Sequence, residues 1–468
     1  MKLSRLSLRD YRCFEFINID FHPQVTVLVA PNGAGKTSIL DAIAVAYGPL
    51  VGAFDEAMGK HFETRDIRQI ATRETASNEM EYAARGARLE AEGNIPGSLI
   101  DGLSKGMTSI WERSLASSRR AKTTIKDARD LVEYGKRLQE AVRTPGAQTV
   151  LPLITYYGTG RLWQQKKLTE LRRYQRTSRT VGYRDCLDPA SSYKSFVEWF
   201  RYWSVSAKEA RLKAMDLHEF PVDSEFDGYV RSVSTAVNIC LSPAGWGDID
   251  YSLAKDALVA HHKVFGELPV EQLSDGIRNM IGMVADIAFR ATKLNGYLGQ
   301  MAAQETPGIV LIDEVDMHLH PEWQQAVVPL LTKAFPRLQF IVTTHSPQVL
   351  STVDADCVRV IHNDRDPDSG QMTTQVLKPE WQTRGVASAD LLARIMNVNP
   401  VPDVPEAHWI NQYQALIQQN LHESSEGVEL CSRLEQHFGR DHPLMLECER
   451  LIRLQSFKQR LPRHMGKE

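Results

Sequence analysis

A glycine-rich segment near the start of the chain constrains the fold more than any other feature. Residues 30–37 read APNGAGKT, and an apolar run over residues 25–29 precedes them. The run predicts a buried strand, and the apolar spacing of residues 38–44 predicts a helix packed on a sheet. A strand, a glycine-rich loop ending in Lys-Thr, and a helix together form a phosphate-binding P-loop. The sequence therefore predicts an α/β fold built around a triphosphate site.

The chemistry of this loop assigns roles to its residues. Small residues let backbone N–H groups turn onto phosphate oxygens, and the helix N-terminus adds a partial positive charge. Lys36 is expected to reach the β- and γ-phosphates, and the Thr37 hydroxyl to ligate Mg²⁺. Ala30 stands where the motif has its first glycine, and it fits there if the backbone is extended. The predicted ATP contacts in the loop are Asn32, Gly33, Ala34, Gly35, Lys36, Thr37 and Ser38.

Composition limits the remaining possibilities. A chain of 468 residues has room for about two to four domains, and its 43% hydrophobic content supplies sizeable cores. The net charge is −3, so a nucleic-acid site has to be a local patch. The six cysteines form no C-x-x-C pair, which argues against zinc and disulfides and suits the reducing cytoplasm. The N-terminal segment is not a signal peptide, and no apolar run predicts a membrane span.

A second motif follows the apolar strand predicted over residues 308–312. The strand ends in Asp313-Glu314. The Asp313 carboxylate is expected to hold Mg²⁺, usually through water, and Glu314 to polarise the water that attacks the γ-phosphate. The alternative is an acidic cap on a strand end, but ligands in such sheets lie at strand C-termini.

Two further motifs flank this strand in the sequence. Leu273-Ser274-Asp275-Gly276 leads into a predicted helix, so a hydroxyl, a glycine backbone and a helix N-terminus form a second phosphate site, or otherwise a plain helix cap. His345 follows the strand predicted over residues 338–343, which a helix over 321–335 joins to the 308–312 strand as a βαβ unit. Its imidazole is placed to hydrogen-bond the γ-phosphate and report its loss.

The middle of the chain is rich in basic and aromatic residues. Residues 161–184 hold eight basic side chains and one acidic one. They predict contact with nucleic-acid phosphates or an acidic partner, or else a solvated helix face. The aromatic stripe at 196–203 is predicted to be core, and residues 226–262 to be mixed strands and turns. The basic residues are Arg161, Lys166, Lys167, Arg172, Arg173, Arg176, Arg179 and Arg184.

The pattern predicts four parts. Two belong to one ATPase head: residues 1–160, with the P-loop and an antiparallel meander over 80–115, and residues 226–400. Between them lies the basic and aromatic helical insert, residues 161–225. Residues 401–468 follow a proline-rich linker and show three amphipathic stripes, which predict a small helical module.

The four motifs together resemble the ABC-type ATPase heads of the RecF/SMC-like superfamily, over roughly residues 1–362. The resemblance implies mixed and antiparallel sheets with a helical insert. It also implies a homodimer or higher oligomer, in which Leu273, Ser274, Asp275 and Gly276 of one head cap ATP bound by the other. His318 and His320 would lie in the loop that crosses to the opposing head. The chain differs from SMC heads in lacking a long coiled-coil arm.

Two assignments stay open within that resemblance. Arg12 either leans on the nucleotide base or phosphates or is a surface arginine on an edge strand. The glutamine with which such heads sense Mg²⁺ is Gln69, Gln164 or Gln165.

Residues 313–324 and 156–163 look similar to the bacterial AAA_15/AAA_21 defence ATPases, in particular the PtuA-type ATPases of Septu and certain retron antiphage systems. That resemblance implies an HNH nuclease partner of the PtuB type, and a retron reverse transcriptase with its RNA and DNA. The chain itself shows no nuclease motif. The sequence thus predicts a slow, regulatory ATPase that controls a nuclease. The alternative is a RecF-like DNA-repair ATPase that binds DNA through its basic insert.

Salt dependence distinguishes these two functions. If the insert binds DNA through about seven phosphates, log affinity falls against log salt with a slope of roughly −6, because bound cations displace counterions. Titration of fluorescent duplex DNA across a salt series measures the slope. Variants with the basic residues of 161–184 neutralised are the control. A flat response would contradict direct DNA binding and favour a protein partner.

Overall fold

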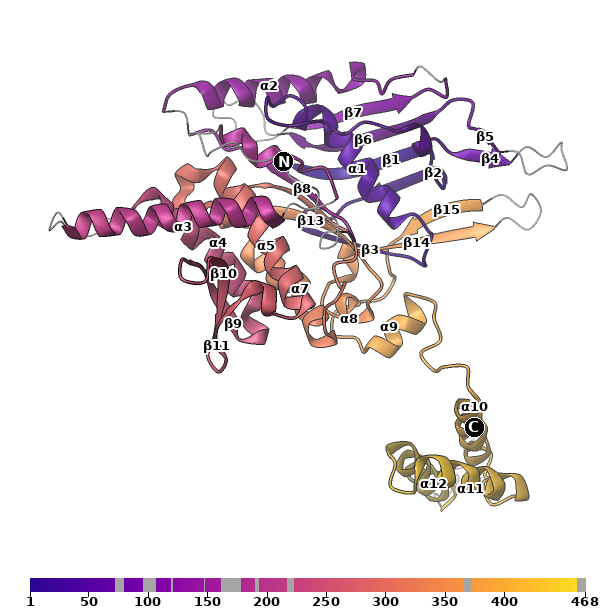
Figure 1. Ribbon diagram of the computed structural model, residues 1–468. Coiled ribbons are helices and arrows are strands. Elements are labelled where there is room, and N and C mark those ends of the chain that lie inside the picture. The colour runs from indigo at the N-terminus through magenta and orange to yellow at the C-terminus, as the bar shows by residue number, and fades with distance from the viewer. Residues whose placement is uncertain are drawn as a thin grey trace, which may run out of the picture. The chain divides into compact units, whose positions relative to one another are not determined.

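The computed structural model describes residues 1–71, 80–95, 107–118, 121–146, 148–160, 178–189, 193–216, 223–365 and 372–460. Contacts divide the chain into two compact units, Met1–Met396 and Asn397–Glu468. Figure 1 shows the first unit as an α/β head and the second as a group of helices. Within the described ranges, no helix combines the length and the apolar character needed to cross a membrane.

A six-stranded sheet carries the predicted motifs. Its order is β15-β14-β3-β13-β12-β8, and all neighbours are parallel except the β14–β15 pair. The strands β3, β12 and β13 are buried along their whole length, as strands covered on both faces should be. The βαβ unit predicted from sequence is present, because α7 (Pro321–Ala334) joins the parallel neighbours β12 and β13. The strands are β3 (Val25–Val29), β8 (Leu153–Tyr157), β12 (Gly308–Ile312), β13 (Leu338–Thr344), β14 (Val358–Arg365) and β15 (Met372–Leu377).

A four-stranded antiparallel sheet lies on the other side of the P-loop helix. Its order is β2-β1-β6-β7, with β1 (Lys2–Tyr11), β2 (Phe14–Asp20), β6 (Ala87–Ile95) and β7 (Met107–Leu115). The helix α1 (Lys36–Val51) contacts β6 and β7 as well as β13, and nearly all its residues are buried. The Trp111 indole N–H donates to the Ala46 carbonyl over 2.9 Å, which ties β7 to α1. The predicted meander is thus present, except that β5 (Met80–Tyr82) pairs with β4 (Gln69–Ala71) in a separate sheet.

The side chain of Gln339 joins the two large sheets. It lies on β13 and is fully buried, and its amide group pairs with backbone N–H and C=O groups as another peptide unit would. Its amide N–H donates to the carbonyls of Leu3 (2.8 Å) and His22 (3.0 Å), and its Oε1 accepts from the Leu3 N–H at 2.8 Å. The β1–β6 ladder is interrupted between Leu3 and Arg5, so these backbone groups find their partner in the amide.

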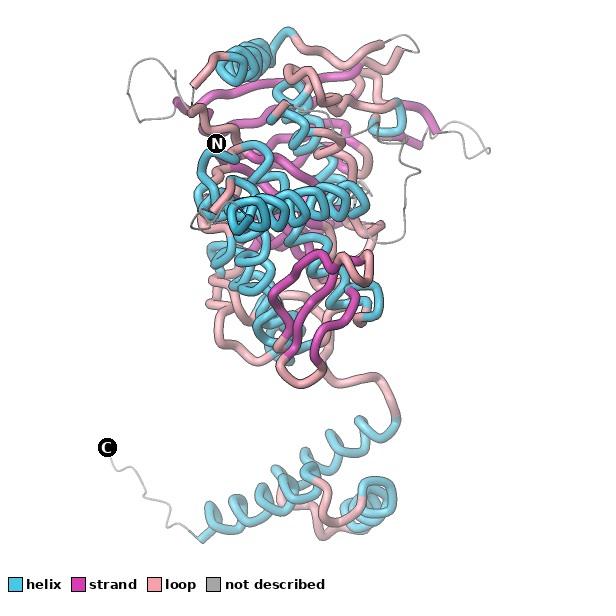
Figure 2. Tube along the Cα trace, turned by 60° about the vertical axis from the view of Figure 1, so that its left-hand side comes forward, coloured by secondary structure: helices cyan, strands magenta, loops and turns pink. Residues whose placement is uncertain are grey.

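Long helices and a short sheet cover the other side of the central sheet. Both views show α3 (Tyr193–Asp216) lying across the outside of the head, and Figure 2 shows the short sheet as a separate group of strands. That sheet has the order β11-β10-β9, formed by Gly266–Pro269, Ala257–His262 and Trp246–Ser252. The helix α4 (Glu225–Leu241) contacts β9 of this sheet, and α5 (Asp275–Leu294) packs on α4. The predicted aromatic core on α3 is confirmed, because Phe196, Trp199, Phe200 and Trp203 are buried.

The prediction of strands and turns from residue 226 onward is wrong for α4. Ser224 caps this helix, and its side chain accepts from the backbone N–H of Asp227. The Asp227 carboxylate accepts from the Ser224 N–H in return, at 2.9 Å. This capping box was visible in the sequence as a serine followed three residues later by an acid, but the mixed hydrophobic pattern after it favoured strands.

The second unit contains three helices, as the sequence predicts. They are α10 (Pro405–Gln418), α11 (Ser425–Phe438) and α12 (Pro443–Arg460). Their shared core consists of Tyr413, Ile417, Leu430, Leu434, Met445 and Cys448. This core is separate from that of the head, so the module has its own packing.

Replacing Gln339 with Leu should destabilise the head. The variant keeps the side-chain volume but removes the partner of two buried backbone groups of Leu3 and of the part-buried carbonyl of His22, which costs about 1–3 kcal/mol for each buried group. Urea unfolding followed by tryptophan fluorescence should show a lower midpoint. Gln325→Leu, at an exposed position on α7, is the matched control and should leave the midpoint unchanged. Equal midpoints for both variants would contradict the bridging role.

Candidate nucleotide-binding and hydrolysis site

The P-loop geometry explains which positions need glycine. Gly33 and Gly35 have φ of 78° and 92°, in the left-handed region. A Cβ on Gly35 would lie 2.3 Å from the Phe14 ring and 2.7 Å from the Cys13 sulfur, so a side chain has no room there. Ala30 does not have a positive φ, so the departure from the motif at this position costs no backbone strain.

Lys36 folds back onto its own loop. Its ammonium donates to the carbonyl oxygens of Ala30 at 2.8 Å and Pro31 at 3.2 Å. Burial lowers the pKa of Lys36, while the nearby carboxylates of Asp313, Glu314 and Asp316 act to raise it. The cation therefore lies beside the acidic strand end, held by neutral carbonyls that a phosphate oxygen is able to replace.

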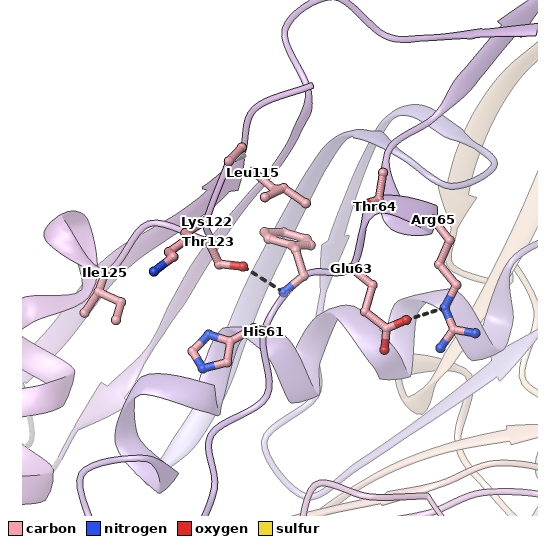
Figure 3. A pocket seen from close by; sticks show the side chains of 10 residues that line it. His61, Glu63, Thr64, Arg65, Leu115, Lys122, Thr123 and Ile125 are labelled. Carbon is pink, nitrogen blue, oxygen red and sulfur yellow. Dashed lines mark hydrogen bonds and ion pairs between the residues drawn. The ribbon is translucent and has the colours of Figure 1, made fainter. Parts of the chain in front are cut away.

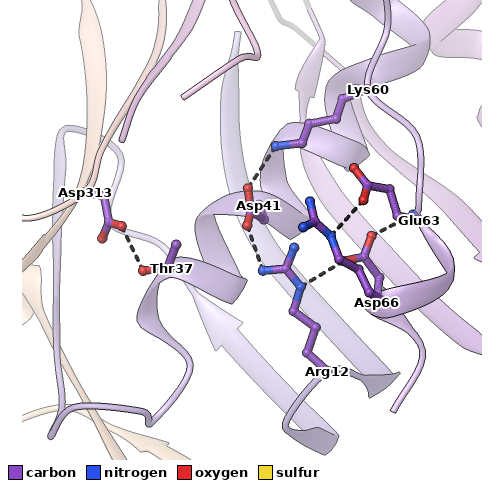
Figure 4. A network of polar contacts seen from close by, with 8 residues as sticks. Arg12, Thr37, Asp41, Lys60, Glu63, Asp66 and Asp313 are labelled. Atoms are coloured by element: carbon purple, nitrogen blue, oxygen red, sulfur yellow. Dashed lines mark hydrogen bonds and ion pairs between the residues drawn. The ribbon is translucent and has the colours of Figure 1, made fainter. Parts of the chain in front are cut away.

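The two predicted Mg²⁺ ligands are in contact. The Thr37 hydroxyl donates to Asp313 Oδ2 over 2.8 Å (Figure 4), and the Thr343 hydroxyl donates to Asp313 Oδ1 over 2.6 Å. Neighbouring ligands of an octahedral Mg²⁺ lie about 2.9 Å apart, given Mg–O distances of about 2.0–2.1 Å. A Mg²⁺ ion bound to the Thr37 hydroxyl would therefore lie beside the Asp313 carboxylate, which would hold it directly or through water.

Glu314 has a strained backbone at the end of β12. Its φ is 47°, which is unusual for a residue with a side chain. Its N–H donates to the Thr343 hydroxyl over 2.8 Å, and this bond holds the strained turn in place. The turn leaves the Glu314 side chain half-buried at the C-terminal edge of the sheet. Strain of this kind concentrates at functional sites, and it supports the assignment of Glu314 as the base.

His345 lies at the end of the neighbouring strand β13. Burial and the charge of Lys36 lower its pKa, against the opposing effect of the acidic groups, and so favour the neutral imidazole. Ser346, which follows His345, connects the C-terminal edge of the sheet to the loop after Glu314. The Ser346 hydroxyl donates to Gln324 Oε1 over 2.7 Å, and the Gln324 amide donates to the Leu319 carbonyl over 2.8 Å.

The signature motif lies at the start of α5, and its serine is not used as a helix cap. Ser274 occupies the cap position and is exposed, yet its side chain makes no capping hydrogen bond. A Cβ on Gly276 would lie 2.6 Å from the His318 carbonyl oxygen, so this glycine allows close contact with the loop after Glu314. A hollow of about 390 Å³ opens here, lined by the signature residues with His318, His320 and Trp323. The lining includes no P-loop residue.

Arg12 lies in a network of charges beside the P-loop helix (Figure 4). Its Nε donates to Asp66 Oδ1 over 2.8 Å, and its Nη1 donates to Asp41 Oδ2 over 2.7 Å. Lys60 donates to the other Asp41 oxygen over 2.8 Å. Burial acts to raise the pKa of Asp41, but Lys60 and Arg12 outweigh it and hold the pKa below its usual value. The contact of Arg12 with ATP remains a prediction.

The segment that carries Lys60 and Asp66 also forms one wall of a cavity of about 730 Å³ (Figure 3). Behind it, the fully buried Arg113 donates to the carbonyls of Val45 at 2.7 Å and Lys60 at 2.8 Å, and it contacts His61 Nδ1 at 3.0 Å. A guanidinium only donates, so Nδ1 of His61 is unprotonated and its Nε2 carries the proton. Arg113 thus fixes the position of the segment next to the charge network.

Sequence reasoning missed several of these residues. Asp41, Lys60 and Asp66 belong to none of the predicted motifs. Thr343 lies two residues before His345, and no pattern assigned it a role. Of the eight basic insert residues, the structure describes two. Arg179 donates to the carbonyls of Leu294 and Thr149, each over 2.7 Å, and Arg184 pairs with Glu56 at 2.7 Å. The other six, with Gln164 and Gln165, lie outside the described residues, and Gln69 is exposed on β4.

Comparisons with known proteins agree with these motifs. Residues 5–208 match a family model described as "AAA domain", and residues 251–351 match one described as "AAA domain, putative AbiEii toxin, Type IV TA system". The second is the AAA_21 family expected from the sequence. The P-loop and the Asp313 strand end thus each lie in a segment that matches an AAA domain model.

The chain is also similar to ATPases of defence systems. It is 26% identical to "Retron Ec83 probable ATPase" of Escherichia coli, over 96% of this chain and 86% of the relative. It is 24% identical to "Retron Vc95 probable ATPase" of Vibrio cholerae, over 94% and 88%. The similarity to "Septu protein PtuA" of Bacillus thuringiensis is partial, with 29% identity over 29% of this chain and 33% of the relative.

Among solved structures, an SMC head bound to the C-winged helix domain of ScpA aligns with 81% of this chain and 99% of its own, at 16% identity and a TM-score of 0.46. The sheets and helices described above make the first unit an α/β fold, as the sequence predicts.

Replacing Glu314 with Gln should block hydrolysis and preserve ATP binding. The amide keeps the size of the side chain but is unable to accept a proton, so the rate should fall by about 10²- to 10⁴-fold. Phosphate release and equilibrium binding of a fluorescent ATP analogue measure the two properties. Lys36→Ala is the control and should lose binding itself. Hydrolysis at the wild-type rate in Glu314→Gln would show that another residue is the base.

Proposed function

We propose that this protein is a Mg²⁺-dependent ATPase whose heads pair around ATP and whose nucleotide state controls a partner nuclease in antiphage defence. The AAA-type domains and the near full-length similarity to retron ATPases support this proposal. The similarity to the retron ATPases covers 96% and 94% of this chain, so it extends beyond the P-loop to the insert and the C-terminal module. We place the protein in the bacterial cytoplasm.

One observation supports the proposal that two heads pair around ATP. The P-loop and the signature hollow are separate within one chain, since no P-loop residue lines the hollow around Ser274. The exposed Ser274 hydroxyl makes no capping bond, and it stands at a helix N-terminus of the kind that binds phosphate. A second copy, related by two-fold symmetry, would bring its P-loop to this hollow and receive the same contact in return.

In this proposal, each residue of the site has a separate role in hydrolysis. Lys36 exchanges the carbonyls of its loop for phosphate oxygens, and Thr37 and Asp313 hold Mg²⁺. The ion supplies charge stabilisation for the phosphoryl oxygens. Glu314 orients the attacking water and accepts its proton. His345, as a neutral imidazole, hydrogen-bonds the γ-phosphate.

A short series of contacts connects His345, the proposed γ-phosphate contact, to the signature hollow. His345 is followed by Ser346, which bonds Gln324, and Gln324 bonds the Leu319 carbonyl. The same loop supplies the His318 carbonyl on which Gly276 packs. We therefore infer that hydrolysis loosens the face between the two heads and changes the surface offered to a partner. The proposed partner is an HNH nuclease of the PtuB type, with a retron reverse transcriptase and its RNA and DNA as further components.

Mixing two inactive variants tests the shared site. Lys36→Ala removes the cradle, and Ser274→Arg fills the signature hollow; each should abolish ATPase activity alone. In a mixed dimer one site has both defects and the other has none. A 1:1 mixture should regain about one quarter of wild-type activity, because half of randomly formed two-fold dimers are mixed and each has one intact site.

The readout has a control and a cellular counterpart. Ser274→Arg alone should still bind ATP at its P-loop, which shows that the variant is folded. Protection of cells against phage, with the neighbouring genes co-expressed, should be lost in each variant and restored by the pair. Absence of recovery in both assays, with both variants folded, would contradict a site shared between two copies.

A further inference from the structure

A second hollow lies in the helical side of the head, apart from the ATPase motifs. Its volume is about 260 Å³, and its lining comes from α3, α4, α5, the turn Arg179–Tyr183 and the turn Gly296–Met301. The residues that give it chemical character are Arg179, Trp203, Tyr229, Lys293 and Tyr297. No residue of the P-loop, the signature or the Asp313 strand end lines it.

Lys293 and Arg179 line this hollow, and neither forms an ion pair with a carboxylate among the residues that the structure describes. The Lys293 ammonium lies 4.0 Å from the centre of the Trp199 ring, and within the described residues it makes no hydrogen bond or ion pair. Burial lowers the pKa of Lys293 to about 8, and only Glu225 acts in the other direction. An ammonium held this way is under-solvated, so an anion beside it replaces the water that burial removed.

Arg179 adds a second positive charge. Its guanidinium donates only to neutral acceptors, the carbonyls of Leu294 and Thr149 at 2.7 Å and the Asn295 side-chain oxygen at 3.3 Å. These bonds fix its plane over the Tyr297 ring, 5.3 Å from the ring centre. The position of the charge is therefore set in advance, and its field is not cancelled by an ion pair in the described part of the chain.

The remaining walls are flat and aromatic. Trp203 is buried and packs against Tyr229, with the ring centres 5.2 Å apart. Gly296 permits this arrangement, because a Cβ there would lie 2.9 Å from the Tyr229 hydroxyl. Tyr297, by contrast, is 39% exposed and stands at the rim. Aromatic faces beside uncompensated cations suit a ligand that combines a flat ring with an anionic group.

We propose that this hollow binds one nucleotide unit, with its base against the aromatic walls and its phosphate at Lys293. The volume limits the occupant, since it is below the roughly 300–1,000 Å³ usual for drug-sized ligands. A free nucleoside monophosphate and the terminal nucleotide of a single strand share this chemistry. The proposal goes beyond the ATPase function and does not depend on it.

The experiment uses full-length protein carrying Lys36→Ala, so that binding at the P-loop does not obscure the second site. The probes are AMP, adenosine and a short single-stranded oligodeoxynucleotide with a 5′-phosphate. Quenching of tryptophan fluorescence, to which Trp199 and Trp203 contribute, and isothermal titration measure binding. AMP or the phosphorylated strand should bind more tightly than adenosine, and the preferred probe identifies the source of the nucleotide.

Variants in the Lys36→Ala background locate the site. Lys293→Met and Tyr297→Ala should each weaken binding, Lys293→Met by about 10- to 100-fold because a charge-assisted hydrogen bond is lost. Lys333→Met, at an exposed position on α7, is the matched control and should bind as the parent does. Tyr297 is at the rim, so its variant remains informative if Lys293→Met fails to fold.

Two outcomes would overturn the proposal. One is that neither AMP nor the phosphorylated strand binds to the Lys36→Ala protein. The other is that both are bound with equal affinity by the folded Lys293→Met, Tyr297→Ala and Lys333→Met variants. Since ATP hydrolysis is absent from every protein in this comparison, failure here leaves the ATPase proposal untouched.

Discussion

The Asp313 carboxylate is the interaction on which the site depends, because it joins the ends of three strands. Its two oxygens accept from Thr37, just after β3 and the P-loop, and from Thr343 on β13. Parallel strands bring their C-terminal ends to one edge of a sheet, where ligands bind. A buried carboxylate is costly without partners, so the two hydroxyls both stabilise Asp313 and fix its oxygens. The fold itself thus places these oxygens where a Mg²⁺ ion bound by Thr37 would meet them.

The signature helix is anchored to the same sheet. Asp286 on α5 accepts from the Tyr157 hydroxyl and from Arg290 Nε, each over 2.7 Å, and all three side chains are buried. Tyr157 ends β8, and its carbonyl accepts the backbone N–H of Asp313 over 2.8 Å. Removing one member of a buried ion pair is strongly destabilising. The middle of α5 is therefore tied, through Tyr157, to the strand end that carries Asp313.

The sequence predicted what depends on local pattern. The P-loop, the Asp-Glu strand end, the βαβ unit and the C-terminal helices follow from apolar spacing and short motifs, and the structure contains them. Contacts between distant residues escaped this reasoning. Residues 338–343 were predicted as a strand, but nothing local shows that the partners of Gln339 within it are Leu3 and His22. Likewise, alternation predicted β1 and β6 as strands but not that they are neighbours.

The charge network around Asp41 shows what binding at Arg12 would require. To reach a nucleotide, Arg12 has to give up a charge-assisted hydrogen bond to Asp41 or to Asp66. If Arg12 leaves Asp41, this carboxylate still has a positively charged partner, because Lys60 remains on its other oxygen. Leaving Asp66 is harder, since that carboxylate is 3% exposed and would keep only the Glu63 backbone N–H among its hydrogen-bond donors. A movement of Arg12 toward ATP would therefore pivot about Asp66 and release Asp41, which lies one helical turn beyond Thr37, the proposed Mg²⁺ ligand.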